Sequence, residues 1–216
     1  MKTPYALVPM LALVVSGCGP QKLALPSDPI GRAATCGVVA AADARSKNQQ
    51  VAAPLSFDKQ GQIVHYALLA GAADQQFSRD KASAVIAQMQ EIQDRITSGK
   101  WQDLVQPCEA AFPEANLSQS VSLPSDPLTS ELSCYMLGKF MTKALASQGN
   151  AYEAQLLQYG ELARALDPKV AVALEKRGIR SETARNVERN EALSTAAKLG
   201  PPSKVMDACS ERYAKT

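Results

Sequence analysis

Hydrophobic residues recur at helical spacing in several windows of the chain. Val85, Met89, Ile92 and Ile96 are four, three and four residues apart, which puts their side chains on one face of a helix. Comparable stripes occur later in the chain: Leu132, Met136 and Phe140, and Met206, Cys209 and Tyr213. Ala, Leu, Gln and Glu are plentiful, and clusters of β-branched residues are few. The pattern predicts an all-α protein built as a helical bundle.

Residue types at the ends of these stripes set the expected helix bounds. Ser78 can cap the start of one helix, and Gly99 can end it. Pro107 is expected either to kink a helix or to mark its true start. The expected helices are 29–46, 60–72, 78–97, 101–112, 127–147, 151–166, 169–197 with a break near Gly178, and 202–214.

The chain also repeats itself once. The stretch LPSDPIGRAATC at 25–36 returns as LPSDPLTSELSC at 123–134, with the same distance from proline to cysteine. In both copies Asp-Pro supplies an N-cap residue followed by proline at the first helical position. The repeat predicts two four-helix units and a polar linker between them, at 28–112, 127–216 and 113–126.

The N-terminal residues form a separate segment. Lys2 gives it a positive start, and the stretch from Tyr5 to Val15 is apolar apart from its proline. This length suits the hydrophobic region of a secretory signal, about 7–15 residues, and is too short for a membrane span of roughly 20. We expect a signal peptide at 1–17 and a tether at 18–27. The alternative is a buried N-terminal helix of the domain.

Val15-Ser16-Gly17-Cys18 ends this segment with an aliphatic residue, two small residues and a cysteine. The stretch resembles the lipobox of bacterial lipoproteins, and the resemblance covers only about the first 18 residues. It implies that Cys18 carries diacylglycerol, that the chain is cut before it, and that the new amino group is acylated. More than one acyl chain gives lasting membrane attachment. By the same resemblance, Gly19 favours the outer membrane, facing the periplasm, over the inner membrane. Ordinary signal cleavage near this point is the alternative.

Four cysteines remain once Cys18 is assigned to lipid: Cys36, Cys108, Cys134 and Cys209. An even number in an oxidising compartment suggests two disulfides, which could pair in three ways. In an up-down bundle the first and fourth helices are antiparallel neighbours, and in each unit both carry a cysteine. Hydrophobic residues also flank Cys108 and Cys209 at matching offsets. We therefore predict the pairs Cys36–Cys108 and Cys134–Cys209.

Charge narrows the class of partner. The chain has 23 Lys and Arg against 21 Asp and Glu, and a mild basic excess over 132–216 is interleaved with glutamates. Such interleaving is typical of a solvated helix face rather than a nucleic-acid patch. Glu188 and Glu191 alternate with Arg185 and Arg189, and we expect surface ion pairs there. The expected partners are the membrane, through the lipid, and other envelope proteins; nucleic acid is not expected.

No motif in the chain carries recognisable chemistry. His65, the single histidine, lies among apolar residues in IVHYALL, and we expect a hydrogen-bonded, partly buried structural residue. No G-x-S-x-G, Walker, G-x-G-x-x-G, H-E-x-x-H or C-x-x-C motif occurs. We predict no catalytic residues, no metal site and no cofactor. Trp101, the single tryptophan, is expected in the core, with anchoring of a partner as the alternative.

These features favour a lipid-anchored cell-envelope protein whose helical, disulfide-linked body has a protein-binding or structural role. The alternative is a bundle that binds a lipid or another small apolar molecule inside. An enzyme of unrecognised activity is the third class.

Overall fold

The computed structural model describes residues 23–48 and 53–213, and the regular structure in these ranges is entirely helical. The prediction of an all-α bundle is confirmed. The expected signal peptide at 1–17 and Cys18 lie outside the described residues. The helices are α1 (Pro29–Ser46), α2 (Phe57–Gly71), α3 (Arg79–Thr97), α4 (Val105–Ala111), α5 (Pro127–Ala144), α6 (Glu153–Lys176), α7 (Glu182–Leu199) and α8 (Pro202–Tyr213), with short 3-10 helices η1 (Trp101–Leu104), η2 (Pro113–Ala115) and η3 (Ala146–Tyr152).

The repeated Asp-Pro signal starts α1 and α5, as predicted. The Asp28 carboxylate accepts a hydrogen bond from the Gly31 amide at 2.6 Å, and the Asp126 carboxylate accepts one from the Thr129 amide at 2.8 Å. Arg177, just after α6, also binds Asp126, with 2.6 Å between Nη2 and Oδ1. The hydroxyl and amide of Thr129, together with Arg177, lower the pKa of Asp126 to about 2. Asp126 therefore links the start of α5 to the end of α6.

Pro168 lies inside α6, so the break expected between residues 166 and 169 is wrong. Proline has no backbone N–H and leaves the carbonyl of Arg164 without its usual helical donor. Both residues are exposed, and water can reach that carbonyl, so the helix continues. Pro107 is in the first turn of α4, where backbone N–H groups have no acceptor within the helix, so the N–H that proline lacks is not missed. The helix starts two residues before it, at Val105.

Gly178 provides the break that the sequence did predict. Its φ of 78° is a conformation that favours glycine. The amides of Gly178 and Ile179 donate back to the carbonyls of Glu175 and Leu174, at 2.9 and 3.0 Å, which ends α6 in a Schellman motif. α7 begins after its N-cap residue, Ser181.

Each half of the molecule is arranged around one central helix. α1 packs against α2, α3 and α4, and α5 packs against α6, α7 and α8. Cys36–Cys108 joins α1 to α4, and Cys134–Cys209 joins α5 to α8, with Cα–Cα distances of 5.3 and 5.7 Å. All four cysteines are buried. The predicted pairing is confirmed.

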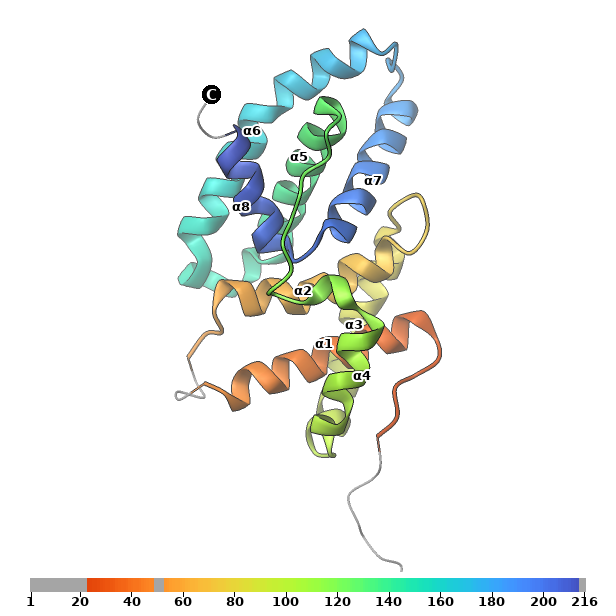
Figure 1. The fold of residues 1–216 in the computed structure, drawn as a ribbon, viewed down its shortest axis with the longest axis vertical. Helices are drawn as coiled ribbons and strands as arrows, with labels where there is room; N and C mark the ends of the chain where they lie inside the picture. The colour runs from red at the N-terminus through yellow and green to blue at the C-terminus, as the bar shows by residue number, and fades with distance from the viewer. Residues whose placement is uncertain (1–22, 49–52, 214–216) are drawn as a thin grey trace, which may run out of the picture.

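The two halves share one hydrophobic core. α2 packs against its own half and also against α7 and α8, so it lies at the boundary between the lower and upper halves in Figure 1. Phe57 at the start of α2 contacts Tyr152 and Tyr159 edge-on, with ring centroids 5.5 and 5.6 Å apart. These contacts join the halves into one packed body.

The linker at 113–126 packs against the second half on its way to α5 (Figure 1). Leu123 is buried, and Arg212 of α8 donates from Nη1 to the Pro124 carbonyl at 3.0 Å. Val121 lies against Gly200, where a Cβ atom would come within 2.9 Å of the valine side chain. A side chain at residue 200 would therefore require Val121 to shift.

Replacing Cys36 and Cys108 together by alanine is expected to lower the free energy of unfolding by about 4 kcal/mol. The reason is that the unfolded chain regains the freedom of a loop of 72 residues. Urea-induced unfolding followed by circular dichroism measures the change. The matched pair Cys134→Ala and Cys209→Ala frees a loop of 75 residues and should lose a similar amount. A loss below about 1 kcal/mol in both variants would contradict the view that the disulfides stabilise the halves.

Candidate functional site

Neither a membrane-crossing helix nor a metal-binding cluster is present among the described residues. Within residues 23–48 and 53–213, no helix is both long enough and apolar enough to cross a membrane. In the same ranges, no three His, Cys, Asp or Glu side chains are grouped so that they could hold a metal ion. Three other places carry groups of interest: a cleft beside the first disulfide, the contact around His65, and the exposed surface of α6.

A cleft of about 270 Å³ opens beside the Cys36–Cys108 disulfide, between α1, α2 and α4. Its rim is charged: the Lys47 ammonium lies 2.7 Å from the Asp43 carboxylate. One wall is fixed by Gln62, whose side chain donates to the Ala115 carbonyl at 2.8 Å. Apolar and polar side chains both line the cleft, but its charged rim and mainly polar exposed surface do not favour an apolar ligand.

Tyr66 is an aromatic residue of this cleft. Its ring packs edge-on against Phe112, with centroids 5.3 Å apart. Burial, together with the Glu109 carboxylate, raises the pKa of Tyr66 to about 12. The phenol is therefore protonated at neutral pH and can donate a hydrogen bond, but it cannot serve as a base. Within this cleft, Tyr66 is suited to act as a hydrogen-bond donor to a small polar molecule.

His65 lies at the boundary between the halves. Its fully buried ring extends from α2, and Nε2 donates to the Ala197 carbonyl of α7 at 2.7 Å. That carbonyl is in the last turn of α7, where backbone oxygens have no intrahelical donor. Nδ1 is also buried and has no hydrogen-bond partner among the described residues. His65 is a hydrogen-bonded structural residue, as expected, and is buried completely rather than partly.

The capping between α2 and α7 is reciprocal. Ser194 of α7 donates its hydroxyl to the carbonyls of Ala72, the C-cap residue of α2, and of Asp74, at 3.3 and 3.1 Å. His65 of α2 in turn donates to the Ala197 carbonyl in the last turn of α7. Burial lowers the pKa of His65 to about 4, against the opposing effect of its hydrogen bond to Ala197. The histidine is therefore neutral at physiological pH and cannot reach solvent to act on a substrate.

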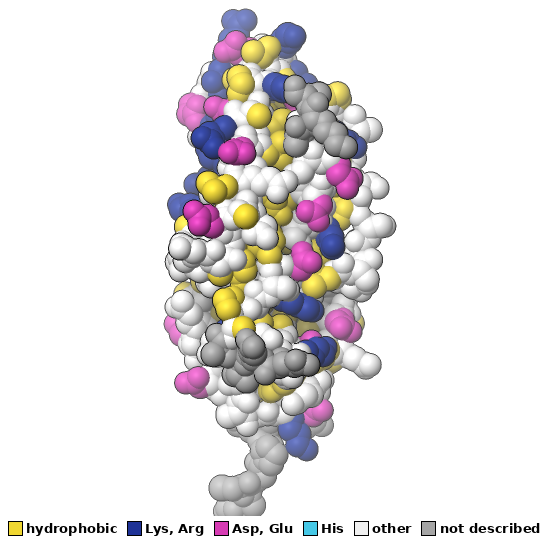
Figure 2. Space-filling model, turned by 90° about the vertical axis from the view of Figure 1, so that its left-hand side faces the viewer, with side chains coloured by type: hydrophobic (Ala, Val, Ile, Leu, Met, Phe, Trp, Pro, Cys, Tyr) yellow, Lys and Arg dark blue, Asp and Glu magenta, His cyan; other side chains and the backbone are white. Residues whose placement is uncertain are grey.

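Large hydrophobic side chains are exposed mainly on the second half. Leu157 and Val172 of α6 are 56% and 51% exposed, and the exposed Pro168 lies between them. The three fall within roughly 60° of one another around the helix, over about four turns. We call them the α6 surface. On the side of the molecule that includes α6, Figure 2 shows hydrophobic side chains in small groups separated by charged and other polar ones.

A shallow depression adjoins the α6 surface at Val172. Its apolar floor includes Pro168 and Ala173, and its rim carries charges of both signs: Glu131, Lys169 and Lys176. An apolar centre with a polar rim is typical of surfaces that contact other proteins.

The sequence analysis did not identify the α6 surface, although one signal was available. Leu156 and Leu157 are adjacent, and neighbours on a helix point about 100° apart. Leu156 packs against the core, and Leu157 is exposed. A leucine pair in a helix that covers one side of a core therefore leaves one member outside.

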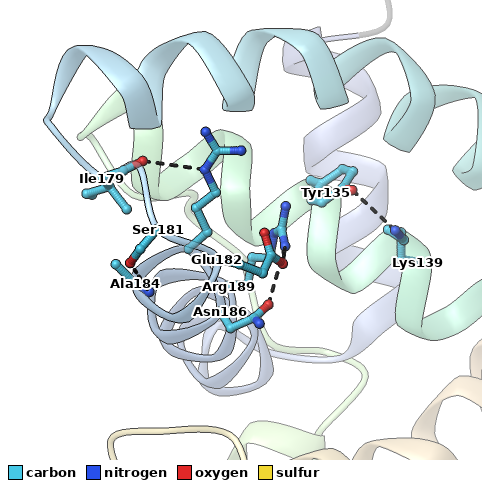
Figure 3. A network of polar contacts seen from close by, with 9 residues as sticks. Tyr135, Lys139, Ile179, Ser181, Glu182, Ala184, Asn186 and Arg189 are labelled. Atoms are coloured by element: carbon cyan, nitrogen blue, oxygen red, sulfur yellow. Dashed lines mark hydrogen bonds and ion pairs between the residues drawn. The ribbon is translucent and has the colours of Figure 1, made fainter.

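A set of polar contacts lies on α7, at the turn before it, and on α5 (Figure 3). Arg189 donates from Nη1 to Glu182 at 2.9 Å and to Asn186 at 3.3 Å. Arg185 donates from Nη2 to Glu175 of α6 at 3.3 Å. On α5, Lys139 donates to the Tyr135 hydroxyl at 3.2 Å.

The expected ion pairs of Arg185 and Arg189 therefore form, but the partners are not the adjacent Glu188 and Glu191. Arg185 turns toward the end of α6, which the Gly178 break brings close. Glu191 instead accepts a hydrogen bond from Gln76 of the first half, at 2.6 Å. For Arg185 a neighbour on another helix therefore competes successfully with neighbours on α7, because exposed pairs within a helix are worth only about 0.3–0.5 kcal/mol. Arg189 pairs within α7, but with Glu182, two turns away.

No family model matches this chain, and searches of curated proteins and of solved structures found no match either. The candidate sites are therefore defined by this chain's own residues.

Titration of His65 is expected to make stability depend on pH. The unfolded chain protonates this histidine near pH 6.5, whereas the folded protein does so only near pH 4. The full free energy of unfolding is therefore present above pH 6.5 and falls by about 3 kcal/mol on acidification to pH 4, because the unfolded state gains a proton that the buried ring refuses. Urea unfolding at several pH values measures the slope.

The control is His65→Gln, whose side-chain amide can still donate to Ala197 and does not titrate. Asp207, whose pKa is raised by burial, titrates in both proteins and cancels in the difference. Wild type and variant should converge in stability as the pH falls. A stability difference that is the same at pH 7 and pH 4 would show that His65 does not titrate on unfolding.

Proposed function

We propose that this protein is exported to the cell envelope, carries lipid on Cys18, and binds other envelope proteins through its helical body. The observation that carries the proposal is the pairing of the four body cysteines with one another. The chain has five cysteines, so Cys18 is left with no cysteine to pair with. A spare thiol at the end of an apolar N-terminal segment fits a lipid-bearing residue. The lipobox resemblance points to the outer membrane, facing the periplasm.

The choice of protein binding rests on the α6 surface. Leu157 and Val172 are more than half exposed in a body whose other large hydrophobic side chains are mostly buried. Scattered exposed residues need no explanation, but these two share one side of a helix with Pro168, and Val172 lines a depression with a charged rim. Inside the described part of the bundle, by contrast, the cleft beside Cys36–Cys108 has a charged rim, which does not favour the apolar-ligand alternative.

Replacing Cys18 by serine is expected to abolish acyl labelling and to leave both disulfides and the folded body intact. The free energy of unfolding should change by less than about 0.5 kcal/mol, because Cys18 takes no part in either disulfide. Labelling with a fatty-acid analogue in cells, followed by non-reducing peptide mapping, measures both parts. Persistent acylation of the variant, or a native disulfide that includes Cys18, would contradict the proposal.

A photo-crosslinking residue placed at Leu157 or at Val172 should capture the same envelope protein in intact cells. Both positions are on the α6 surface, and a partner that covers one covers the other. Mass spectrometry of the adducts identifies the captured protein.

Ile86 of α3 is the matched control, since it is also a large exposed hydrophobic residue, 39% exposed, but on the first half. It should not give that adduct. Equal capture at all three positions would indicate random collision, and no capture at 157 and 172 would remove the α6 surface as the binding site.

A further inference from the structure

The chain is fixed to the body from residue 23 onward. Leu23 lies against the turn after α3: a Cβ atom added to Gly99 would come within 2.9 Å of the Leu23 side chain. Leu25 also packs against the core. Arg32 then donates to the carbonyls of Pro26 and Ser27, at 3.1 and 2.6 Å.

The distance from Cys18 to the body is therefore limited by chain length alone. The expected tether was 18–27, but residues 23–27 are already held on the body. Five residue steps separate Cys18 from Leu23. Whatever conformation they adopt, they span at most about 18 Å. That is less than the length of α3, whose 19 residues extend about 28 Å. A lipid on Cys18 must stay close to the end of the molecule at which Leu23 lies.

That end is formed by the last turn of α3 and by η1, residues 95–103, at the bottom of Figure 1. Trp101 is partly buried and packs against the core there. Tryptophan is favoured at the level of lipid headgroups because its ring is apolar and its N–H is polar. Ser98 and Lys100 are exposed beside it.

Charge at this end does not select a lipid. The exposed Arg95 and Lys100 are balanced by the exposed Asp94 and Asp103. Attraction to anionic headgroups requires a cluster of basic residues, which these residues do not provide. The short connection to Cys18 must therefore be what brings this end to the bilayer. The orientation should then be the same on zwitterionic and on anionic lipids.

Given lipid on Cys18, as proposed above, we infer that the body stands on the membrane with residues 95–103 against the lipid headgroups. The first half then lies next to the bilayer. The second half projects away from it, and the turn between α6 and α7, at the top of Figure 1, is farthest from the lipid. The α6 surface is left open to proteins in the aqueous space.

Trp101, as the single tryptophan, reports this arrangement directly. The lipidated full-length mature protein is reconstituted into phosphatidylcholine vesicles that contain dansyl-labelled headgroups, and energy transfer from Trp101 to dansyl is measured. Transfer should be efficient. Insertion of 20 Gly and Ser residues after Lys22 adds a coil with a mean span of about 25 Å and should lower the transfer at least twofold.

A donor at the far end gives the matched control. The variant Trp101→Phe with Arg180→Trp moves the tryptophan to the exposed turn between α6 and α7. Its transfer should be at least twofold weaker than that of wild type in the same vesicles. Replacing a quarter of the phosphatidylcholine by phosphatidylglycerol should leave the ratio between the two proteins unchanged.

Flotation with the vesicles separates the two proposals. Protein that carries no acyl chain and does not float with the vesicles overturns lipidation, and the orientation with it. Protein that floats but shows equal transfer from Trp101 and from the tryptophan at 180 overturns the orientation and leaves lipidation in place. Energy transfer from Trp101 that does not change when the spacer is inserted also overturns the orientation and leaves lipidation in place.

Discussion

Each half of this protein depends on a covalent link between its central helix and its last helix. Cys36 and Cys134 lie at buried positions of α1 and α5, and their partners are on α4 and α8. α4 has only seven residues, too few for a helix to be stable by its own hydrogen bonds. The disulfide keeps α4 on α1, and the helices between them must fold back along α1. The second half repeats the arrangement with α5 and α8.

The connection between the halves is of a different kind, since it is made by packing and by hydrogen bonds alone. α2 is shared between the two sets of helices, and the ends of α2 and α7 cap each other through His65 and Ser194. A buried carbonyl without a donor would cost about 1–3 kcal/mol, so these two side chains offset a penalty that close packing of helix ends creates. Part of the boundary between the halves is therefore polar.

In the proposed function, the membrane anchor and the protein-binding surface belong to different halves of the body. The N-terminal chain meets the body at the turn after α3, and the exposed hydrophobic residues of α6 are on the other half. A short connection between lipid and body restricts which faces can meet the membrane and which can meet a protein. In the proposed arrangement, this restriction gives the helical body a defined orientation toward its partners.

The sequence by itself determined the local features of this protein. Asp-Pro pairs start helices because their effect needs only the next few backbone amides, and hydrophobic spacing predicts a helix because it depends on one helical period. The repeat added the disulfide pairing, since equivalent cysteines in two similar units should pair alike. Only the tertiary structure decided that α6 continues through Pro168, that α2 joins both halves, that His65 is enclosed, and that Leu23 is held at Gly99. Each of these depends on which distant surfaces come together, and a residue's spacing along the chain carries no information about the neighbour that will cover it.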